Sequence, residues 1–164
     1  CGGRFRGAIP LPTLPFPVGG GMSSDFEFQS RDTIFEALRP FLNAHAARLV
    51  RYGLEHTHHS PTVESAARHL GVHRRALEYR EARAGLMTPQ RILSWCRAFH
   101  AAELLGRTEA STEQISEVLG YSSPDAMRKA LRRLGLTVTG LRRPGGPERS
   151  VLSLVSEFRR ASAR

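Results

Sequence analysis

One ten-residue pattern occurs twice in this chain, at Thr62–Gly71 and again 49 residues later at Ser111–Gly120. Each copy begins with a hydroxyl residue, has Glu two residues later and an apolar residue in its middle, and ends in Leu-Gly. A hydroxyl cap at the start and a glycine at the end predict a short capped helix. Because a repeated pattern indicates a repeated structural unit, this feature constrains the fold more than any other.

A second helix is predicted after each copy, over Val72–Ala84 and over Pro124–Leu134. A short helix, a glycine turn and a second helix form a helix-turn-helix unit, in which the second helix lies in the major groove of DNA. One such pattern is a weak signal, but two in register with basic second helices are a strong one. We expect each unit to have its own small core, formed by Leu70 with Leu77 and by Leu119 with Met127.

A longer helix is predicted between the two units. It begins at Thr88-Pro89, runs to Leu105 and is expected to stop at Gly106. Its apolar residues follow the 3.6-residue period of a helix. They are Ile92, Trp95, Cys96, Phe99, Ala102 and Leu105.

The rest of the chain is predicted to add helices at both ends. A short helix is expected to end near Leu38 and a second to start at Pro40, because proline breaks a continuous helix. After a break at residues 142–147, an amphipathic helix is predicted with one apolar face, formed by Val151, Leu154, Val155 and Phe158.

The predicted fold is therefore all-α, with two helix-turn-helix subdomains joined by a long linker helix and extra N- and C-terminal helices. The expected division has five parts: a disordered Gly/Pro-rich arm (1–31), an N-terminal helical segment (32–61), a first unit with its linker helix (62–87 and 88–106), a second unit (111–143) and a tail (144–164).

The charge of the chain favours a polyanionic partner, with a net charge of +9 and a pI of about 11.1. All but one of the 24 basic residues are Arg, and the exception is Lys129. A GC-rich genome explains this preference for Arg as well as phosphate recognition does.

No apolar run is long enough to span a membrane, and prolines interrupt the apolar stretch 8–18, so we expect a cytoplasmic protein. Two cysteines are too few for a disulfide framework, and Cys96 is expected in the core. The first residues, Cys-Gly-Gly, suit either the mature N-terminus of a lipoprotein or a fragment of a longer sequence. We favour a fragment or an over-extended reading frame, in which translation starts at Met22.

Residues 62–143 resemble the DNA-binding domain of the AraC/XylS family of bacterial transcriptional regulators. In the first unit and the linker the resemblance rests on Ala66-Ala67, Leu70-Gly71, Leu77, Gly85-Leu86-x-Thr-Pro and Arg97-Ala-x-x-Ala-Ala-Glu-Leu-Leu. In the second unit it rests on Ile115, Leu119-Gly120-Tyr121-Ser122-Ser123, Met127–Arg133 and Gly135-Leu136-Thr137. The resemblance implies a regulator, either an activator or a repressor, in which a long helix sets the two recognition helices about one DNA turn apart on one face of the duplex.

The chain departs from the family pattern at several positions. Glu81 stands where an aromatic residue is usual, His73 where Ser usually opens the first recognition helix, and Leu131 where Phe is frequent. After the last glycine, Thr137-Val138 replaces Thr-Pro, and the second recognition helix is one residue shorter before Gly135. These changes leave the fold intact and weaken any inference about the target sequence.

Candidate DNA contacts follow from helical position. Arg74 and Arg75 suit the N7 and O6 of guanine, and Glu78 suits the N4 amino group of cytosine. The candidates for base contact are Arg74, Arg75, Glu78, Tyr79, Asp125, Arg128 and Lys129. The candidates for phosphate contact are Ser123, Arg132, Arg133, Arg142 and Arg143. The alternative for each base candidate is that it contacts only phosphate or nothing.

Other classes of function have less support. His56, His58 and His59 with Glu55 lack the spacing of a metal site and are expected to be solvated helix-end residues, so no metal or cofactor is predicted. No nucleophile–base set or phosphate-binding loop is present in the sequence, so no enzyme is predicted.

The alternatives to a sequence-specific DNA-binding domain are a helical protein-interaction module and a non-specific DNA-binding protein. Double-stranded DNA is the expected partner and RNA polymerase a candidate one; no membrane partner is expected. Residues 1–61 are too short for a ligand-holding β-barrel, so no effector ligand is evident.

Overall fold

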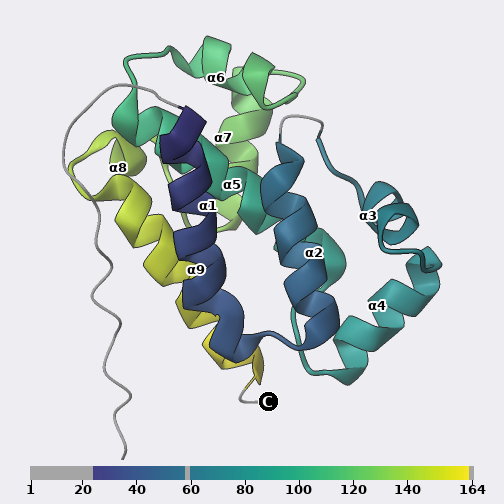
Figure 1. Ribbon diagram of the computed structural model, residues 1–164. Coiled ribbons are helices and arrows are strands. Elements are labelled where there is room, and N and C mark those ends of the chain that lie inside the picture. The colour runs from purple at the N-terminus through teal and green to yellow at the C-terminus, as the bar shows by residue number, and fades with distance from the viewer. Residues whose placement is uncertain (1–23, 58–59, 163–164) are drawn as a thin grey trace, which may run out of the picture.

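All regular structure in the described residues, 24–57 and 60–162 of the computed structural model, is helical, which confirms the all-α class. In chain order the helices are α1 (Ser24–Leu38), the 3-10 helix η1 (Arg39–Phe41), α2 (Ala44–Glu55), α3 (Val63–His69), α4 (Arg74–Arg83), α5 (Pro89–Arg107), α6 (Thr112–Val118), α7 (Pro124–Arg133), α8 (Val138–Arg142) and α9 (Gly146–Ser162). The helix α5 runs through the middle of the molecule, with the pair α3–α4 and the pair α6–α7 on different sides of it (Figure 1).

The two copies of the repeat form α3 and α6, and both begin with the predicted hydroxyl cap. The Thr62 side chain accepts a hydrogen bond from the Ser65 backbone N–H, and the Ser111 side chain accepts one from that of Gln114. In both helices the third residue returns the bond to the cap backbone, which completes a capping box. The two copies of the sequence repeat therefore have the same local structure.

The helix that follows each copy starts differently in the two units. Gly71 (φ 68°) and Gly120 (φ 63°) turn the chain in the left-handed conformation that glycine tolerates. After the second turn, Ser123 caps α7 by accepting a hydrogen bond from the Ala126 N–H. After the first turn, His73 precedes α4 without any side-chain cap, so the first N–H groups of α4 have no such partner.

The linker helix α5 is longer than expected. Its start agrees with the prediction, because Thr88 accepts a hydrogen bond from the Arg91 N–H and Pro89 is the first helical residue. The expected stop at Gly106 is wrong, because the helix continues through it to Arg107. A Cβ on Gly106 would lie 2.6 Å from Cγ of Pro147, so this glycine permits a close approach of the α8–α9 turn.

The N-terminal region also differs from expectation. The irregular arm was expected to reach residue 31, but helix α1 already begins at Ser24. A helix was expected to start at Pro40; this residue lies instead in η1, and α2 begins later, after Asn43 accepts a hydrogen bond from the Ala46 N–H. Proline fits the first turn of a 3-10 helix because it needs no N–H donor there. Residues 1–23 and His58–His59 lie outside the described residues.

The C-terminal region holds one helix that was not expected. Thr137 caps α8 by accepting a hydrogen bond from the Gly140 N–H. The predicted amphipathic helix is α9, whose residues Val151, Leu154 and Phe158 are buried. This helix packs along α5 and also contacts α1 and α8, as Figure 1 shows. Helix α9 therefore packs on the linker helix, whereas α1 packs on α9 and α2.

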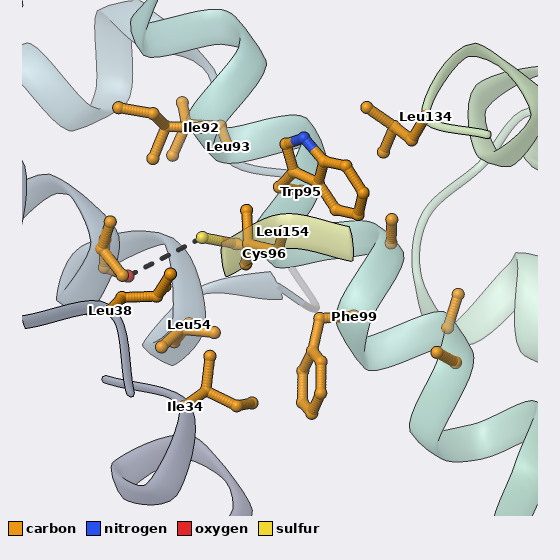
Figure 2. Packing of buried hydrophobic residues seen from close by; sticks show 14 of the residues in the cluster. Ile34, Leu38, Leu54, Ile92, Leu93, Trp95, Cys96, Phe99, Leu134 and Leu154 are labelled. Atoms are coloured by element: carbon orange, nitrogen blue, oxygen red, sulfur yellow. Dashed lines mark hydrogen bonds between the residues drawn. The ribbon is translucent and has the colours of Figure 1, made fainter. Parts of the chain in front are cut away.

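The expectation of two small cores is wrong, because one continuous apolar cluster extends through both units. Leu77 of the first unit and Met127 of the second belong to the same cluster, joined through the buried face of α5. Figure 2 shows part of it, with Trp95, Cys96 and Phe99 of α5 among side chains of α1, α2 and α9. Cys96 is buried as expected, its Sγ lies 3.8 Å from the Val50 carbonyl oxygen, and burial raises its pKa to about 12, so its thiol stays protonated.

Candidate nucleic-acid interface

Helix α4 turns one face to the core and the other to solvent. Leu77 and Glu81 are buried, one helical turn apart. Arg74, Arg75 and Tyr79 are exposed, with Tyr79 showing 65% of its surface, and Glu78 is half-buried. All four base-contact candidates on this helix therefore lie off the core face, and their contact with bases stays a prediction.

Two of these candidates are engaged with each other. The Arg74 Nε donates a hydrogen bond of 2.9 Å to Oε1 of Glu78, which raises the pKa of Arg74. The Arg75 guanidinium makes no hydrogen bond or ion pair with the described residues. Arg75 therefore has a charged group ready for an external acceptor, whereas Arg74 must first leave Glu78.

A basic hollow lies beside the start of α4. It has a volume of about 570 Å³. Its lining residues are Glu64, Arg68, Val72, His73, Arg74 and Arg75. Three arginines against one glutamate make this hollow suited to an anion such as a DNA phosphate. Arg68, on α3, is not among the residues that the sequence suggested for DNA contact; its place one turn before Gly71 was the available signal.

Helix α7 repeats the arrangement of α4. Asp125 and Lys129 are exposed, and Arg128 is half-buried. The Arg128 Nη1 lies 2.7 Å from Oδ1 of Asp125, so again an arginine and an acid among the base-contact candidates pair along one helix. The Lys129 ammonium has no hydrogen-bond partner among the described residues. The Ser123 hydroxyl, already an acceptor for the cap, keeps its own proton to donate.

The phosphate candidates at the end of the second unit are all exposed, but one is engaged. The Arg142 Nη2 donates a hydrogen bond of 2.6 Å to the Ala110 carbonyl, which ties α8 to the loop before α6. The side chains of Arg132, Arg133 and Arg143 make no such contact within the described residues. These three are therefore better placed than Arg142 to reach DNA.

The turn of the second unit is held from two sides. Arg97 of α5 donates two hydrogen bonds, of 3.0 and 2.6 Å, to the Leu119 carbonyl, and its guanidinium stacks on the Tyr121 ring at 3.6 Å. Ser60, which precedes the first unit, donates to the carbonyls of Leu119 and Gly120 at 3.4 and 3.0 Å. The orientation of the second unit thus depends on side chains outside it, which no local pattern identified.

The comparison with protein families covers both helix-turn-helix units. Residues 66–143 match a family model described as a helix-turn-helix domain. The match begins within α3 and ends just after α8, so it includes the turns of both units and all of α5. Residues 66–143 are an AraC-type helix-turn-helix domain. This AraC-type domain binds DNA and serves transcription regulation. Comparisons with curated proteins and with solved structures found no match.

Other kinds of site find no support around the AraC-type domain. Within the described residues, no three His, Cys, Asp or Glu residues are placed to hold a metal ion, and no helix is long and apolar enough to cross a membrane. Domains of this family are regulatory and generally not enzymes. His56, expected to be solvated, is half-buried instead: its ring stacks on that of Tyr52 at 4.3 Å and lies 5.4 Å from that of His69.

Proposed function

We propose that the AraC-type domain reads two successive major-groove segments of one DNA duplex, with α4 in one segment and α7 in the next. The observation that carries this proposal is the single core, because both helices are held on α5 by one apolar cluster. Helices held on one scaffold keep a constant separation, which suits two successive grooves on one face of a duplex. The net charge of +9 favours association with either segment.

Base contacts are assigned to the exposed sides of α4 and α7. Arg75 and Lys129 reach base edges directly. Two further pairs, Arg74 with Glu78 and Arg128 with Asp125, exchange their internal bonds for bonds to bases. Water screens such exposed pairs, so they contribute little to stability and DNA can displace them easily. Tyr79 offers its exposed ring to the groove.

Phosphate contacts flank these base contacts. Their residues are Arg68 and the uncapped N–H groups of α4 in the first unit, and Ser123, Arg132, Arg133, Arg142 and Arg143 in the second. Function as a sequence-specific regulator, contact with RNA polymerase and location in the cytoplasm stay predictions. The proposal requires no catalytic step and no cofactor.

Selection from a pool of random duplexes tests this function. The chain should enrich one motif and bind it at least ~10³-fold more tightly than random DNA. Arg75→Ala should relax the preference in one part of the motif, at a cost of about 1–3 kcal/mol. Arg133→Ala should weaken binding to all sequences alike and lower the salt dependence by about one ion.

The rival functions predict different results. A protein-interaction module would show no salt-sensitive binding to any duplex, and a non-specific DNA-binding protein would enrich no motif. If the two variants lose affinity equally on every sequence, the assignment of base and phosphate roles is wrong.

A further inference from the structure

Glu157 of α9 lies where three hydrogen bonds converge on one carboxylate. Arg91 donates from Nε to Oε1 at 2.7 Å and from Nη2 to Oε2 at 3.2 Å, and the Trp95 indole N–H donates to Oε2 at 2.8 Å. Both donors are on α5, and α9 lies outside the family match. This arrangement is therefore an addition of this chain to its AraC-type domain.

The remaining arm of the Arg91 guanidinium reaches the second unit. Its Nη1 donates a hydrogen bond of 3.2 Å to the carbonyl of Arg133, the last residue of α7. The last carbonyls of a helix lack partners within the helix and carry partial negative charge, so a guanidinium stabilises them. One continuous set of contacts thus leads from Glu157 through Arg91 to the C-terminal end of α7.

The two parallel bonds to Glu157 determine the direction of the third bond. A carboxylate bound in this two-pronged way fixes the plane of a guanidinium, so Nη1 of Arg91 points at α7. The side chain of Arg91 is 39% exposed and that of Glu157 20%. Glu157 also lines an open groove of about 460 Å³, together with Trp95, Leu134 and Gly135. Without the carboxylate, Arg91 would lose the two bonds that fix its plane, and nothing else among its hydrogen bonds would direct Nη1 at the Arg133 carbonyl.

Docking of α9 does not rest on Glu157 alone. The buried side chains Val151, Leu154 and Phe158 of α9 belong to the common core. We therefore expect α9 to stay on α5 in a variant that lacks the carboxylate.

We propose that Glu157 is a positioning residue for DNA recognition, which holds the C-terminal end of α7 through Arg91 and so sets the angle of α7 in the groove. The proposal rests on the function given above, in which α7 reads bases. On this proposal, α9 takes part in DNA recognition by the second unit. It also predicts that a change on α9, away from the proposed contacts, alters the choice of bases in one segment only.

The test compares Glu157→Gln with a matched control on the same helix. Glu148→Gln removes another carboxylate of α9 that pairs with an arginine of α5, because Oε1 of Glu148 lies 3.5 Å from Nη2 of Arg107. A third variant, Arg91→Lys, keeps the positive charge but cannot bond Glu157 and the Arg133 carbonyl in the same forked geometry. A fourth variant combines Glu157→Gln with Arg91→Lys. Two properties are measured for each protein, and thermal unfolding checks that the wild type and the four variants are folded.

The first property is base discrimination. It is the affinity ratio between the selected duplex and duplexes with one base pair changed in the α7 or the α4 segment. Glu157→Gln and Arg91→Lys should each lower discrimination in the α7 segment about tenfold, the scale of one lost base contact, and leave the α4 segment unchanged. Combining the two changes should add little, and Glu148→Gln should match the wild type.

The second property is amide hydrogen exchange at the end of α7 without DNA. The N–H groups of Leu134 and Gly135 bond to the carbonyls of Leu131 and Arg132. Their exchange should become about tenfold faster in Glu157→Gln and stay unchanged in Glu148→Gln.

Wild-type discrimination and wild-type exchange in Glu157→Gln would overturn the proposal, and so would equal effects of Glu157→Gln and Glu148→Gln. A wild-type selection that returns only one segment contradicts the proposed function instead. In that case the exchange comparison still decides whether Glu157 holds the end of α7.

Discussion

Among single residues, Glu81 is the one whose side chain conflicts most with its surroundings. It is fully buried on the core face of α4, and neither carboxylate oxygen has a hydrogen-bond partner among the described residues. Burial alone raises its pKa from 4.5 to about 7, and no neighbouring charge contributes. The sequence showed only that Glu81 replaces an aromatic residue usual in the family; its burial on the core face appears in the structure.

The stability of the protein should therefore depend on pH through Glu81. Because the folded state holds the proton more tightly than the unfolded state, the free energy of unfolding should fall by about 3 kcal/mol as pH rises from about 4.5 to above 7. Urea unfolding at pH 5 and pH 8 measures this. Glu81→Gln should remove most of the difference, and Glu81→Met should stabilise the protein at pH 8. The control Glu55→Gln, on an exposed side chain, should keep the wild-type dependence, and a wild-type dependence in Glu81→Gln would contradict the account.

At the level of elements, the repeat supplies a matched pair of glycines. Gly71 and Gly120 end α3 and α6 with nearly the same positive φ. A Cβ on Gly71 would meet no atom within 4 Å, whereas one on Gly120 would lie 2.4 Å from Oγ of Ser60. The two turns are alike in conformation and differ in what packs on them.

Alanine at the two positions should therefore have unequal effects. Gly71→Ala should cost about 1–2 kcal/mol in unfolding free energy, the strain of a left-handed alanine. Gly120→Ala should cost at least about 1 kcal/mol more, because Ser60 must give up its hydrogen bonds to the turn. Adding Ser60→Ala, with Ser60→Ala alone as reference, should remove that excess. Equal costs for the two glycine variants would show that Ser60 does not hold the second unit.

The sequence predicted those elements that are determined by residues close together in the chain. The caps at Thr62 and Ser111 and the apolar face of α9 depend on residues a few positions apart, so patterns identified them. Gly106 was misread as a stop because its cause, the approach of Pro147, lies 41 positions further along the chain. Arg97 belonged to the family pattern, yet its bond to Leu119 appears only when α5 and α6 come together.

For the molecule as a whole, the main difference from expectation is the number of cores. The sequence divides into two similar units, which suggested two subdomains on a rod. The structure joins them in one apolar cluster, with α2 and α9 packed on α5 as well. Site candidates on exposed faces were predictable from helical periodicity, whereas the ion pairs between them and the anchoring of the units were not. One shared core makes the separation of α4 and α7 a property of the entire fold.

A footprint on lengthened duplexes tests this central claim most directly. On the selected duplex, two major-groove segments about 10 base pairs apart should be protected together. Five inserted base pairs turn the segments to opposite faces, so they should no longer be protected together and affinity should fall about 100-fold, towards that of one unit. Ten inserted base pairs restore the face but not the distance, and a rigid molecule should fail to recover. Recovery with ten base pairs, or a single protected segment that neither insertion disturbs, would contradict the account.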